Sequence, residues 1–448
     1  MNCFKAYDIR GVWGKDLNEE TVYRIGYFLP DIVGFNNILV GQDIRLSSDT
    51  VMYNLAKGLN DRGVSVDFVG LSTTPLIYWT TAKMGYHASV MITASHNPSN
   101  HNGLKISGLN ATPIGYDSGL DKLESLVESD KITTIAEKRG IINKIDIYEQ
   151  YINFLSQYKV DISNLKIAVD CSNGMSSLFI KQLLGDTPVY INDKPDGRFP
   201  GHEPNPLEAE NRKQLTGTVM SHACDIGLLF DGDADRITFI DEKGNFVSPD
   251  LIIALLGHYF LEEKKQKGIV LQDIRSSRAV QEYLKRFNAE VVTWKVGRAY
   301  AALKLRELDG CYGGELAGHY YFRDFYYSDS GIMAALIVLR ILLRFKEKGM
   351  TMSELTSNIS DYFNTGEINF KIENKKDAME DVKNYFFAKK QPVKFYDFDG
   401  YRLDYENFWF SIRPSNTEPY LRFIAEAKSQ NLLDDILNNV KAIIEYYE

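Results

Sequence analysis

Short apolar runs rich in β-branched residues alternate with longer helical patterns through most of this 448-residue chain. In the first part, strands are predicted at 38–43, 64–70 and 88–94, and helices at 19–29, 49–61 and 75–84. Such alternation is typical of α/β layers with largely parallel strands. It recurs after residue 166 and again after residue 249, so we expect three similar mixed α/β domains.

The last part of the chain has a different pattern. Strands are predicted near 367–372, 393–397, 401–404, 408–412 and 420–427, and helices at 377–387 and 432–446, which indicates a smaller α+β domain. The chain is too long for a single core. We expect domains at 1–147, 148–248, 249–364 and 365–448. Because no Pro/Gly/Ser-rich linker separates them, they should pack tightly, with ligand sites at their junctions.

Composition excludes several classes of protein. The net charge of -9 argues against a nucleic-acid partner, which requires a basic patch. The four cysteines form no C-x-x-C pair, which favours free thiols in a reducing compartment. The N-terminal residues lack the apolar core of a signal peptide, and the apolar helix predicted at 331–339 is too short to span a bilayer. We therefore expect a cytoplasmic protein, monomeric or dimeric, with no membrane partner.

Three carboxylates occupy alternate positions directly after an apolar strand: Asp231, Asp233 and Asp235. In an extended stretch they share one face, where they repel one another unless a cation neutralises them. Oxygen-only ligands suit Mg²⁺ or Ca²⁺, and three carboxylates leave an octahedral Mg²⁺ short of ligands. An EF-hand is disfavoured because Arg236 occupies the position of its glycine. A solvated acidic turn without metal remains the alternative.

Ser95 follows the strand predicted at 88–94, in a turn-prone loop with His96, Asn97 and Pro98. An isolated serine here is more often a turn or capping residue, and His96 alone is more often structural. Serine needs activation or prior modification to act in group transfer. Lys105, ten residues further on, supplies a mobile proton or a cation.

Two further loops suggest ligand contacts. GGELAGH (313–319) places glycines around Glu315, and glycines allow a backbone to approach a ligand closely. RPSNTEP (413–419) gathers a guanidinium, hydroxyls and an amide, which suits a phosphate. Taken alone, a glycine-rich turn and a polar turn explain these segments equally well.

These motifs occur together and in a fixed order: FKAYDIRG (4–11), GQDIRLSS (41–48), TASHNP (93–98) with NGLK (102–105), DGDADR (231–236), GGELAGH (313–319) and RPSNTEP (413–419). The set closely resembles the α-D-phosphohexomutase family over essentially the whole chain. DGRFPGHEPNPLE (196–208) and GHYYFRDFYYSDSG (318–331) resemble its bacterial phosphomannomutase/phosphoglucomutase branch. The resemblance implies four domains around a central cleft, each giving one loop.

By this resemblance Ser95 is a phosphoserine whose phosphate, with Asp231, Asp233 and Asp235, holds Mg²⁺. The other expected catalytic residues are Arg10, Lys105 and His96. The expected substrate-binding residues are Tyr7, Arg236, Arg275, Arg298, Glu315, Ala317, His319, Arg413, Ser415, Asn416, Thr417 and Arg422. Among these, Glu315 binds sugar hydroxyls, and the residues from 413 to 422 hold the phosphate that is not being transferred.

The resemblance implies conversion of mannose 1-phosphate to mannose 6-phosphate through a hexose 1,6-bisphosphate, which is both intermediate and activator, with glucose phosphates as further substrates. The alternatives are a phosphoglucosamine mutase and a phosphosugar-binding protein without turnover. Five positions depart from the family pattern, and at two of them Lys5 and Gln42 replace arginines that are common in the first two motifs. Ala317 stands where serine is usual, Arg298 where many relatives have histidine, and Arg275 where some have lysine.

Overall fold

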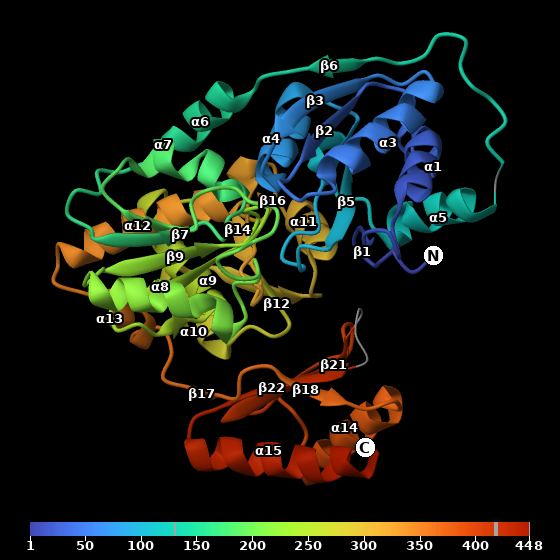
Figure 1. The fold of residues 1–448 in the computed structure, drawn as a ribbon. Helices are drawn as coiled ribbons and strands as arrows, with labels where there is room; N and C mark the ends of the chain where they lie inside the picture. The colour runs from blue at the N-terminus through green and yellow to red at the C-terminus, as the bar shows by residue number, and fades with distance from the viewer. Residues whose placement is uncertain (130, 416–419, 448) are drawn as a thin grey trace.

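The structure is a computed structural model that describes residues 1–129, 131–415 and 420–447. In these residues the strands form four sheets that follow one another along the chain (Figure 1). Sheet 1 spans residues 9–144, sheet 2 spans 167–247, sheet 3 spans 269–329 and sheet 4 spans 363–427. Sheets 1 to 3 are mixed and flanked by helices, and sheet 4 is antiparallel, which confirms the predicted fold class.

Sheet 1 has the strand order β1-β5-β4-β2-β3-β6. Its strands are β1 (Ile9–Val12), β2 (Ile38–Gln42), β3 (Val66–Leu71), β4 (Ala88–Ile92), β5 (His101–Gly108) and β6 (Ile142–Lys144). Its helices are α1 (Glu19–Phe28), α2 (Pro30–Val33), α3 (Ser48–Asp61), α4 (Thr74–Met84) and α5 (Leu120–Ser129). β4, β2, β3 and β6 are parallel, whereas β5 is antiparallel to β4 and β1.

Helix α4 illustrates how local sequence sets these boundaries. Thr73 caps its start, since its Oγ1 accepts a hydrogen bond from Leu76 N at 3.1 Å, and Pro75 lies in the first turn. Gly85 ends the helix in the left-handed conformation, with φ of 72°, as expected of a C-cap glycine. These signals fix where α4 begins, and Thr74 at that position contacts the candidate site described below.

Sheet 2 has the order β11-β10-β9-β7-β8 and sheet 3 the order β13-β12-β14-β15-β16. The strands of sheet 2 are β7 (Ile167–Asp170), β8 (Val189–Ile191), β9 (Ile226–Phe230), β10 (Ile237–Asp241) and β11 (Phe246–Val247), with helices α6 (Tyr148–Ser156), α7 (Ile180–Leu184) and α8 (Ala209–Ser221). Those of sheet 3 are β12 (Ile269–Asp273), β13 (Glu290–Trp294), β14 (Tyr312–Gly314), β15 (Tyr320–Phe322) and β16 (Ser328–Asp329), with helices α9 (Pro249–Gly257), α10 (Arg278–Leu284), α11 (Arg298–Glu307), α12 (Gly331–Lys346) and α13 (Met352–Ser357).

Sheet 4 and its two helices form what we call the C-terminal unit (residues 363–447). Its strands are β17 (Phe363–Asn364), β18 (Ile368–Lys371), β19 (Lys394–Tyr396), β20 (Tyr401–Asp404), β21 (Phe408–Pro414) and β22 (Tyr420–Ala427), and its helices are α14 (Lys375–Lys389) and α15 (Gln430–Ile444). β17 pairs with β22 although it precedes the predicted boundary at residue 365. α15 lies along one face of the sheet (Figure 1).

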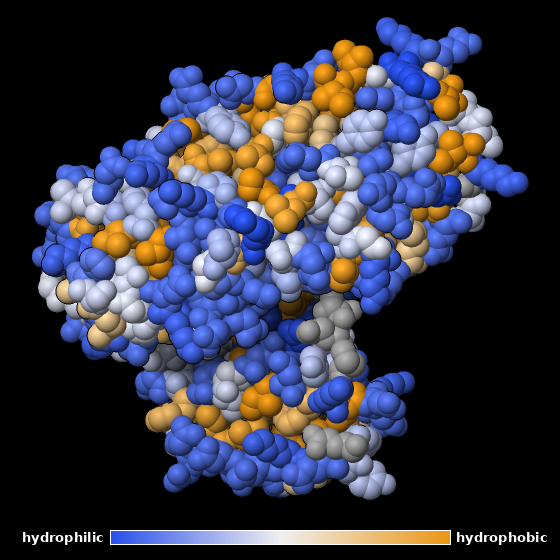
Figure 2. All heavy atoms as spheres, viewed as in Figure 1, coloured by the Kyte–Doolittle hydropathy of each residue, from blue (hydrophilic) through white to orange (hydrophobic). Residues whose placement is uncertain are grey.

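The buried apolar side chains divide the molecule unevenly. One cluster runs from Leu39 to Ile359 and so joins parts of sheets 1, 2 and 3 in a shared core. The C-terminal unit has a core of its own, from Phe370 to Ile444. Figure 2 shows the molecule hollowed on this face where the C-terminal unit meets the rest.

α12 extends the apolar helix predicted at 331–339 to 16 residues, most of which are buried. Among the described residues, no helix combines the length and the hydropathy needed to cross a bilayer.

Candidate active site

Three loops that are far apart in sequence meet at the carboxyl ends of their strands, where ligands bind in α/β sheets. The serine loop (93–98) follows β4 of sheet 1. The aspartate loop (231–236) follows β9 of sheet 2. The glycine loop (313–319) joins β14 to β15 in sheet 3.

Ser95 and Asp231 join the serine loop to the aspartate loop. Ser95 Oγ donates a hydrogen bond to Asp231 Oδ2 at 2.9 Å, across 136 positions of sequence. Both residues are fully buried. Ser95 has a φ of 52°, a left-handed conformation that is uncommon outside glycine, and its N–H donates to Thr93 Oγ1 at 2.9 Å. The hydroxyl is therefore held at the carboxylates by backbone and side chain together.

Asp231, Asp233 and Asp235 converge, with one carboxylate oxygen from each lying within 4.8 Å of the others. The convergence arises from a turn, with Ala234 at φ 62°, and not from the extended stretch that was expected. A turn folds alternate residues toward a common centre more tightly than a strand does. Burial, and then the charges of Asp233 and Asp235, raise the pKa of Asp231 well above its ordinary value.

The residues fit a hard divalent cation. All three aspartates are fully buried, which contradicts the alternative of a solvated acidic turn. Asp233 Oδ1 and Asp235 Oδ1 have no hydrogen-bond partner within the described part of the chain. Buried, unpartnered carboxylate oxygens are costly unless a positive charge faces them, and oxygen donors are those that Mg²⁺ and Ca²⁺ prefer.

Lys105 supplies a fixed positive charge beside the aspartates. It lies on β5, and its Nζ donates to Asp233 Oδ2 at 2.6 Å and to Asp235 Oδ2 at 2.5 Å. Burial disfavours its charged form, but attraction to the two carboxylates outweighs burial and raises the pKa of Lys105. Thr74, at the start of α4, donates from its N to the carbonyl of Asp233 at 3.0 Å and from its Oγ1 to Asp233 Oδ2 at 2.5 Å.

Three further predicted residues surround Ser95. Arg10 donates from Nη1 to Asn97 Oδ1 at 2.7 Å, so it braces the serine loop. Arg236 N donates to Asp231 Oδ1 at 3.2 Å, and its Nε lies 3.8 Å from Asp231 Oδ2. Burial, followed by the nearby guanidinium and ammonium charges, lowers the pKa of His96 well below its ordinary value. His96 is therefore a neutral imidazole at neutral pH.

The glycine loop is joined to the aspartate loop through the backbone. Ile237 N donates to Gly318 O at 3.1 Å, and Arg236 and His319 form an antiparallel bridge. Glu315 lies inside this loop, 2 % exposed, and accepts hydrogen bonds from Tyr321 Oη at 2.8 Å and Gly297 N at 3.3 Å. Burial raises the pKa of Glu315.

A charged chain leads from the glycine loop to Arg298. His319 Nδ1 lies 2.6 Å from Asp329 Oδ2, and Arg298 Nε donates to Asp329 Oδ1 at 3.2 Å. The Arg298 guanidinium stacks on Tyr78 at 3.6 Å from the ring centroid. Tyr7 Oη donates to the carbonyl of Val296, two residues before Arg298, at 3.1 Å. Ala317 is half-buried in the turn of the glycine loop.

The predicted phosphate-binding arginines lie between sheet 3 and the C-terminal unit, each beside a carboxylate. Glu367 accepts from Arg422 Nη1 at 2.8 Å and from Arg275 Nη1 at 3.4 Å. Arg413 Nη2 donates to Asp399 Oδ1 at 3.3 Å. Ser415 N donates to Tyr420 O at 2.8 Å. The predicted ligands Asn416 and Thr417 lie outside the described residues.

Four residues at the site were missed by the sequence reasoning: Arg45, Thr74, Tyr321 and Asp329. Arg45 lies inside the quoted segment GQDIRLSS, and Tyr321 and Asp329 lie inside GHYYFRDFYYSDSG, but nothing in the residue types marks these three as site residues. Thr74 carried one signal, since it directly follows Thr73 at a predicted helix start.

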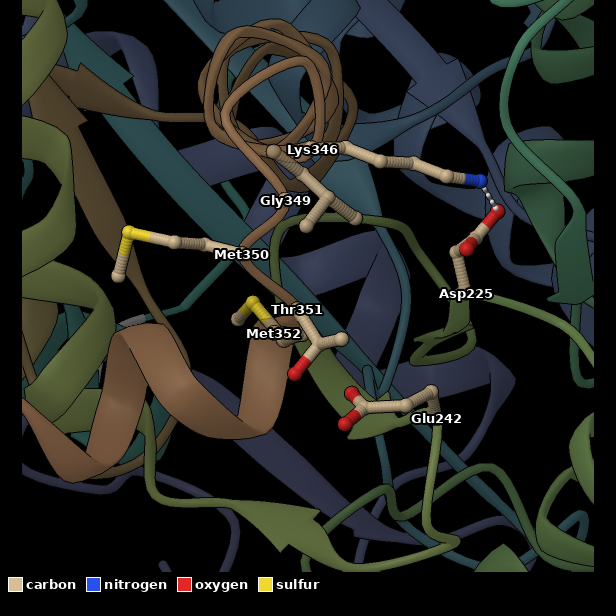
Figure 3. A pocket seen from close by; sticks show the side chains of 8 residues that line it. Asp225, Glu242, Lys346, Gly349, Met350, Thr351 and Met352 are labelled. Atoms are coloured by element: carbon tan, nitrogen blue, oxygen red, sulfur yellow. Dashed lines mark hydrogen bonds and ion pairs between the residues drawn. The ribbon is translucent and has the colours of Figure 1, made fainter.

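A separate cavity of about 270 Å³ is lined by Asp225, which precedes β9, so it lies at the other end of that strand from Asp231. Figure 3 shows the side chains that line it. Lys346 Nζ donates to Asp225 Oδ2 at 2.6 Å at its rim, and Glu242 accepts from Ser353 N at 3.1 Å. Met350 and Met352 also line it. Because it lies at the end of β9 away from the aspartate loop, this cavity is not part of the candidate site.

Models of a single protein family match nearly the whole chain. Phosphoglucomutase/phosphomannomutase alpha/beta/alpha domains I, II and III match residues 1–133, 149–244 and 248–362, and the C-terminal domain of that family matches residues 367–443.

Individual relatives agree with these matches. A phosphomannomutase of Methanocaldococcus jannaschii is 34 % identical over 452 residues, covering 99 % of this chain and 98 % of that protein. A phosphomannomutase of Escherichia coli K12 is 35 % identical over 442 residues, covering 96 % and 95 %. A crystal structure of a phosphoglucomutase/phosphomannomutase family protein from Burkholderia thailandensis superposes with a TM-score of 0.89 at 27 % identity, covering 100 % of this chain and 97 % of the other.

The fold is that of a phosphohexomutase. The chain belongs to the phosphoglucomutase/phosphomannomutase family of enzymes.

Proposed function

We propose that this protein is a phosphomannomutase that interconverts mannose 1-phosphate and mannose 6-phosphate, and that it also accepts glucose phosphates. The contact that carries the proposal is the hydrogen bond of Ser95 Oγ to Asp231 Oδ2 at 2.9 Å. It brings a nucleophilic hydroxyl to a buried carboxylate cluster that suits a divalent cation. The relatives named phosphomannomutase support the choice of sugar.

The proposed reaction starts from phosphorylated Ser95. The Oγ–P bond breaks while phosphorus bonds to the free hydroxyl oxygen of a hexose monophosphate, and the proton of that hydroxyl passes to Ser95 Oγ. The resulting hexose 1,6-bisphosphate turns around, and the reverse step with its other phosphate restores phosphoserine. Arg10 stabilises the charge on the transferring group, and Lys105 stabilises that charge and moves the proton. Positioning and charge neutralisation account for most of the catalysis of such transfers.

Asp231, Asp233 and Asp235, with an oxygen on phosphorylated Ser95, would hold Mg²⁺, which neutralises charge on the transferring group when bound. Glu315 accepts hydrogen bonds from sugar hydroxyls, and Arg413, Ser415 and Arg422 hold the other phosphate. We propose a cytoplasmic location on the basis of four buried free thiols among the described residues.

The test is a coupled assay of mannose 1-phosphate conversion with Mg²⁺ and a trace of hexose 1,6-bisphosphate. We expect turnover by the natural protein, none by Ser95→Ala, and full activity in Ser99→Ala, which changes an exposed serine four residues after Ser95. Intact-mass analysis should detect one phosphoryl group that Ser95→Ala lacks. Release of free phosphate faster than isomer formation would indicate a phosphatase instead. A preference for glucosamine phosphate would indicate a phosphoglucosamine mutase.

A further inference from the structure

Arg45 lies beneath the serine loop, and its side chain is completely buried. A guanidinium carries five N–H groups. Each has an acceptor here: Nε donates to Asp43 Oδ2 at 3.0 Å, Nη1 to Pro98 O at 2.6 Å and His101 O at 3.1 Å, and Nη2 to Ser95 O at 2.8 Å and Asn97 O at 2.6 Å. Four of the five acceptors are backbone carbonyls of residues 95–101.

This arrangement differs from that of the arginines expected to meet the substrate. Arg10 Nε, Arg236 Nε and Arg298 Nη2 are buried and have no hydrogen-bond partner among the described residues. Those groups can bind a phosphate or a sugar oxygen. Arg45 can do so only by giving up one of these five hydrogen bonds, so its contacts define a positioning role and not a substrate-binding one.

The serine loop needs such support. Ser95 has a φ of 52°, a conformation that costs free energy in residues other than glycine. Its carbonyl, which accepts from Arg45, also faces the aspartate loop, because a Cβ added at Gly232 would lie 2.7 Å from Ser95 O. Arg45 therefore binds this carbonyl, and the backbone at Gly232 packs close to it.

A segment from the part of the chain that forms sheet 2 covers Arg45. The Phe199 ring lies over the Arg45 guanidinium, and the guanidinium carbon is 5.0 Å from the ring centroid. At Gly197 an added Cβ would lie 2.3 Å from Ile44 O, so only glycine allows this approach. The part of the chain that supplies the aspartates thus also holds the arginine that supports the serine.

We propose that Arg45, held in place by Phe199, is the positioning residue that keeps Ser95 Oγ at the aspartate loop during phosphoryl transfer. The inference rests on the proposed function. While the Oγ–P bond breaks and the bond from phosphorus to the sugar hydroxyl forms, the carbonyls of residues 95, 97, 98 and 101 stay bound to one rigid cation. The proton passes from the hydroxyl to Ser95 Oγ, and Arg45 keeps its charge and its protons throughout.

The test is Arg45→Lys. A lysine ammonium has three N–H groups, so at least two of the five acceptors lose their donor. We expect kcat for mannose 1-phosphate to fall about 100-fold or more, the effect of a reacting group displaced by about 1 Å, with KM within about threefold of the natural value. After phosphorylation of Ser95 by hexose 1,6-bisphosphate, release of phosphate to water should rise relative to isomer formation. A merely structural role does not move that ratio.

Phe199→Leu keeps all five hydrogen bonds and removes the ring, so it serves if Arg45→Lys does not fold. We expect its kcat to fall about 2- to 30-fold, the loss of one desolvated cation–π contact. The matched control is Arg62→Lys, which changes an arginine that also pairs with a carboxylate, Asp31 at 2.7 Å, and stacks on Tyr27 and Phe35. It should retain natural kcat.

The inference would be overturned if a folded Arg45→Lys, or Phe199→Leu, had the same kcat and the same ratio of phosphate release to isomer formation as the natural protein. A rise in KM without a fall in kcat would also overturn it. An inactive natural protein would contradict the proposed function instead. In that event the rate at which hexose bisphosphate phosphorylates Ser95, followed by intact mass, still tests Arg45, because transfer to a displaced serine is slower.

Discussion

The surroundings of Ser95 and those of Arg413 are built differently. The serine, aspartate and glycine loops are joined by buried hydrogen bonds and rest on the apolar core that runs from Leu39 to Ile359. Arg413 belongs to the C-terminal unit, whose core is separate. The parts expected to transfer a phosphoryl group are thus fixed to one another, and the part expected to hold the second phosphate is attached to them.

That attachment is mostly polar. Arg278 donates to the carbonyls of Glu406 at 2.9 Å and Phe408 at 3.0 Å, and Arg402 Nη1 donates to Ile274 O at 2.8 Å and Ser276 O at 2.7 Å. Water can replace polar contacts between domains more readily than it can enter an apolar core. Relative motion of domains joined by polar contacts is therefore the usual expectation. We expect the C-terminal unit to be the part that adjusts while the bisphosphate turns around.

We call the serine, aspartate and glycine loops the fixed region, and the substitution with the largest expected effect tests it. Asp233→Asn removes a charge that faces Lys105 Nζ at 2.6 Å and Thr74 Oγ1 at 2.5 Å. We expect kcat to fall about 10³-fold or more, about 4 kcal/mol of transition-state stabilisation, with weaker dependence on Mg²⁺. A Mg²⁺ titration of initial rates measures both.

The control for this substitution is Asp186→Asn, an aspartate of the same part of the chain whose side chain is 88 % exposed and pairs with Lys181. It should behave as the natural protein. Activity of Asp233→Asn within tenfold of natural would remove the metal role assigned to the aspartate loop.

The second largest effect tests the C-terminal unit, which we call the attached region. Arg413→Lys loses the planar fork that binds phosphate, so we expect KM for the hexose phosphate to rise about 10- to 100-fold, equivalent to charge-assisted hydrogen bonds of about 1.5–3 kcal/mol. The level of Ser95 phosphorylation should not change. Steady-state kinetics with intact-mass analysis measures both, with the exposed Arg286→Lys as control. A fall in kcat at constant KM would contradict the division of the site into two regions.

Glu315→Gln returns to the fixed region with a smaller effect. At neutral pH we expect kcat/KM to fall about 10-fold or somewhat more, because a charged acceptor of sugar hydroxyls becomes neutral. Burial raises the pKa of Glu315, so this carboxylate becomes protonated at a higher pH than an ordinary glutamate does. As the pH is lowered, kcat/KM of the natural protein should therefore begin to fall at that higher pH. Glu315→Gln should lack this acid limb.

Stability separates binding from folding in that experiment. Because the pKa of Glu315 is raised in the folded state, its ionised form is the less favourable one there, and stability is lost as pH rises from the unfolded pKa through the folded one. Glu315→Gln at neutral pH should therefore unfold at a temperature no lower than the natural protein. A lower unfolding temperature would show that the ionised carboxylate supports the loop instead.

Much of the fold could be predicted from the sequence, because apolar periodicity reports local structure directly. β5 was missed, since it begins with His101, Asn102 and Gly103, which do not favour strands, and only pairing with β1 and β4 makes it one. α8 was missed because only Asn211, Leu215 and Val219 of its residues are buried. α9 begins at Pro249, directly after Ser248, but the Ser248 hydroxyl donates to Asp250 and does not cap the helix.

The site was predictable from residue chemistry for Asp231 and its two neighbouring aspartates, whereas Ser95 was singled out by the resemblance to a known family. It was not predictable for Arg45 or Thr74, because their partners are set by tertiary packing. Arg45 bonds to residues about fifty positions away, and Thr74 to Asp233 across 159. An arginine or a threonine in a polar turn carries no mark of such partners, so the supporting residues of a site emerge only from the structure.

The smallest expected effect concerns Ala317, which belongs to the fixed region. The turn that carries it is closed by Gly318 N donating to Glu315 O at 3.0 Å, so Ala317→Ser adds a hydroxyl without moving the loop. One neutral hydrogen bond contributes about 1 kcal/mol, which is about fivefold in kcat/KM. Mannose and glucose differ only at carbon 2, so we expect the ratio of kcat/KM for their 1-phosphates to change by up to that factor. Ala317→Cys has a side chain of similar size and a weak donor, and an equal change in both variants would assign the effect to size and not to the hydroxyl.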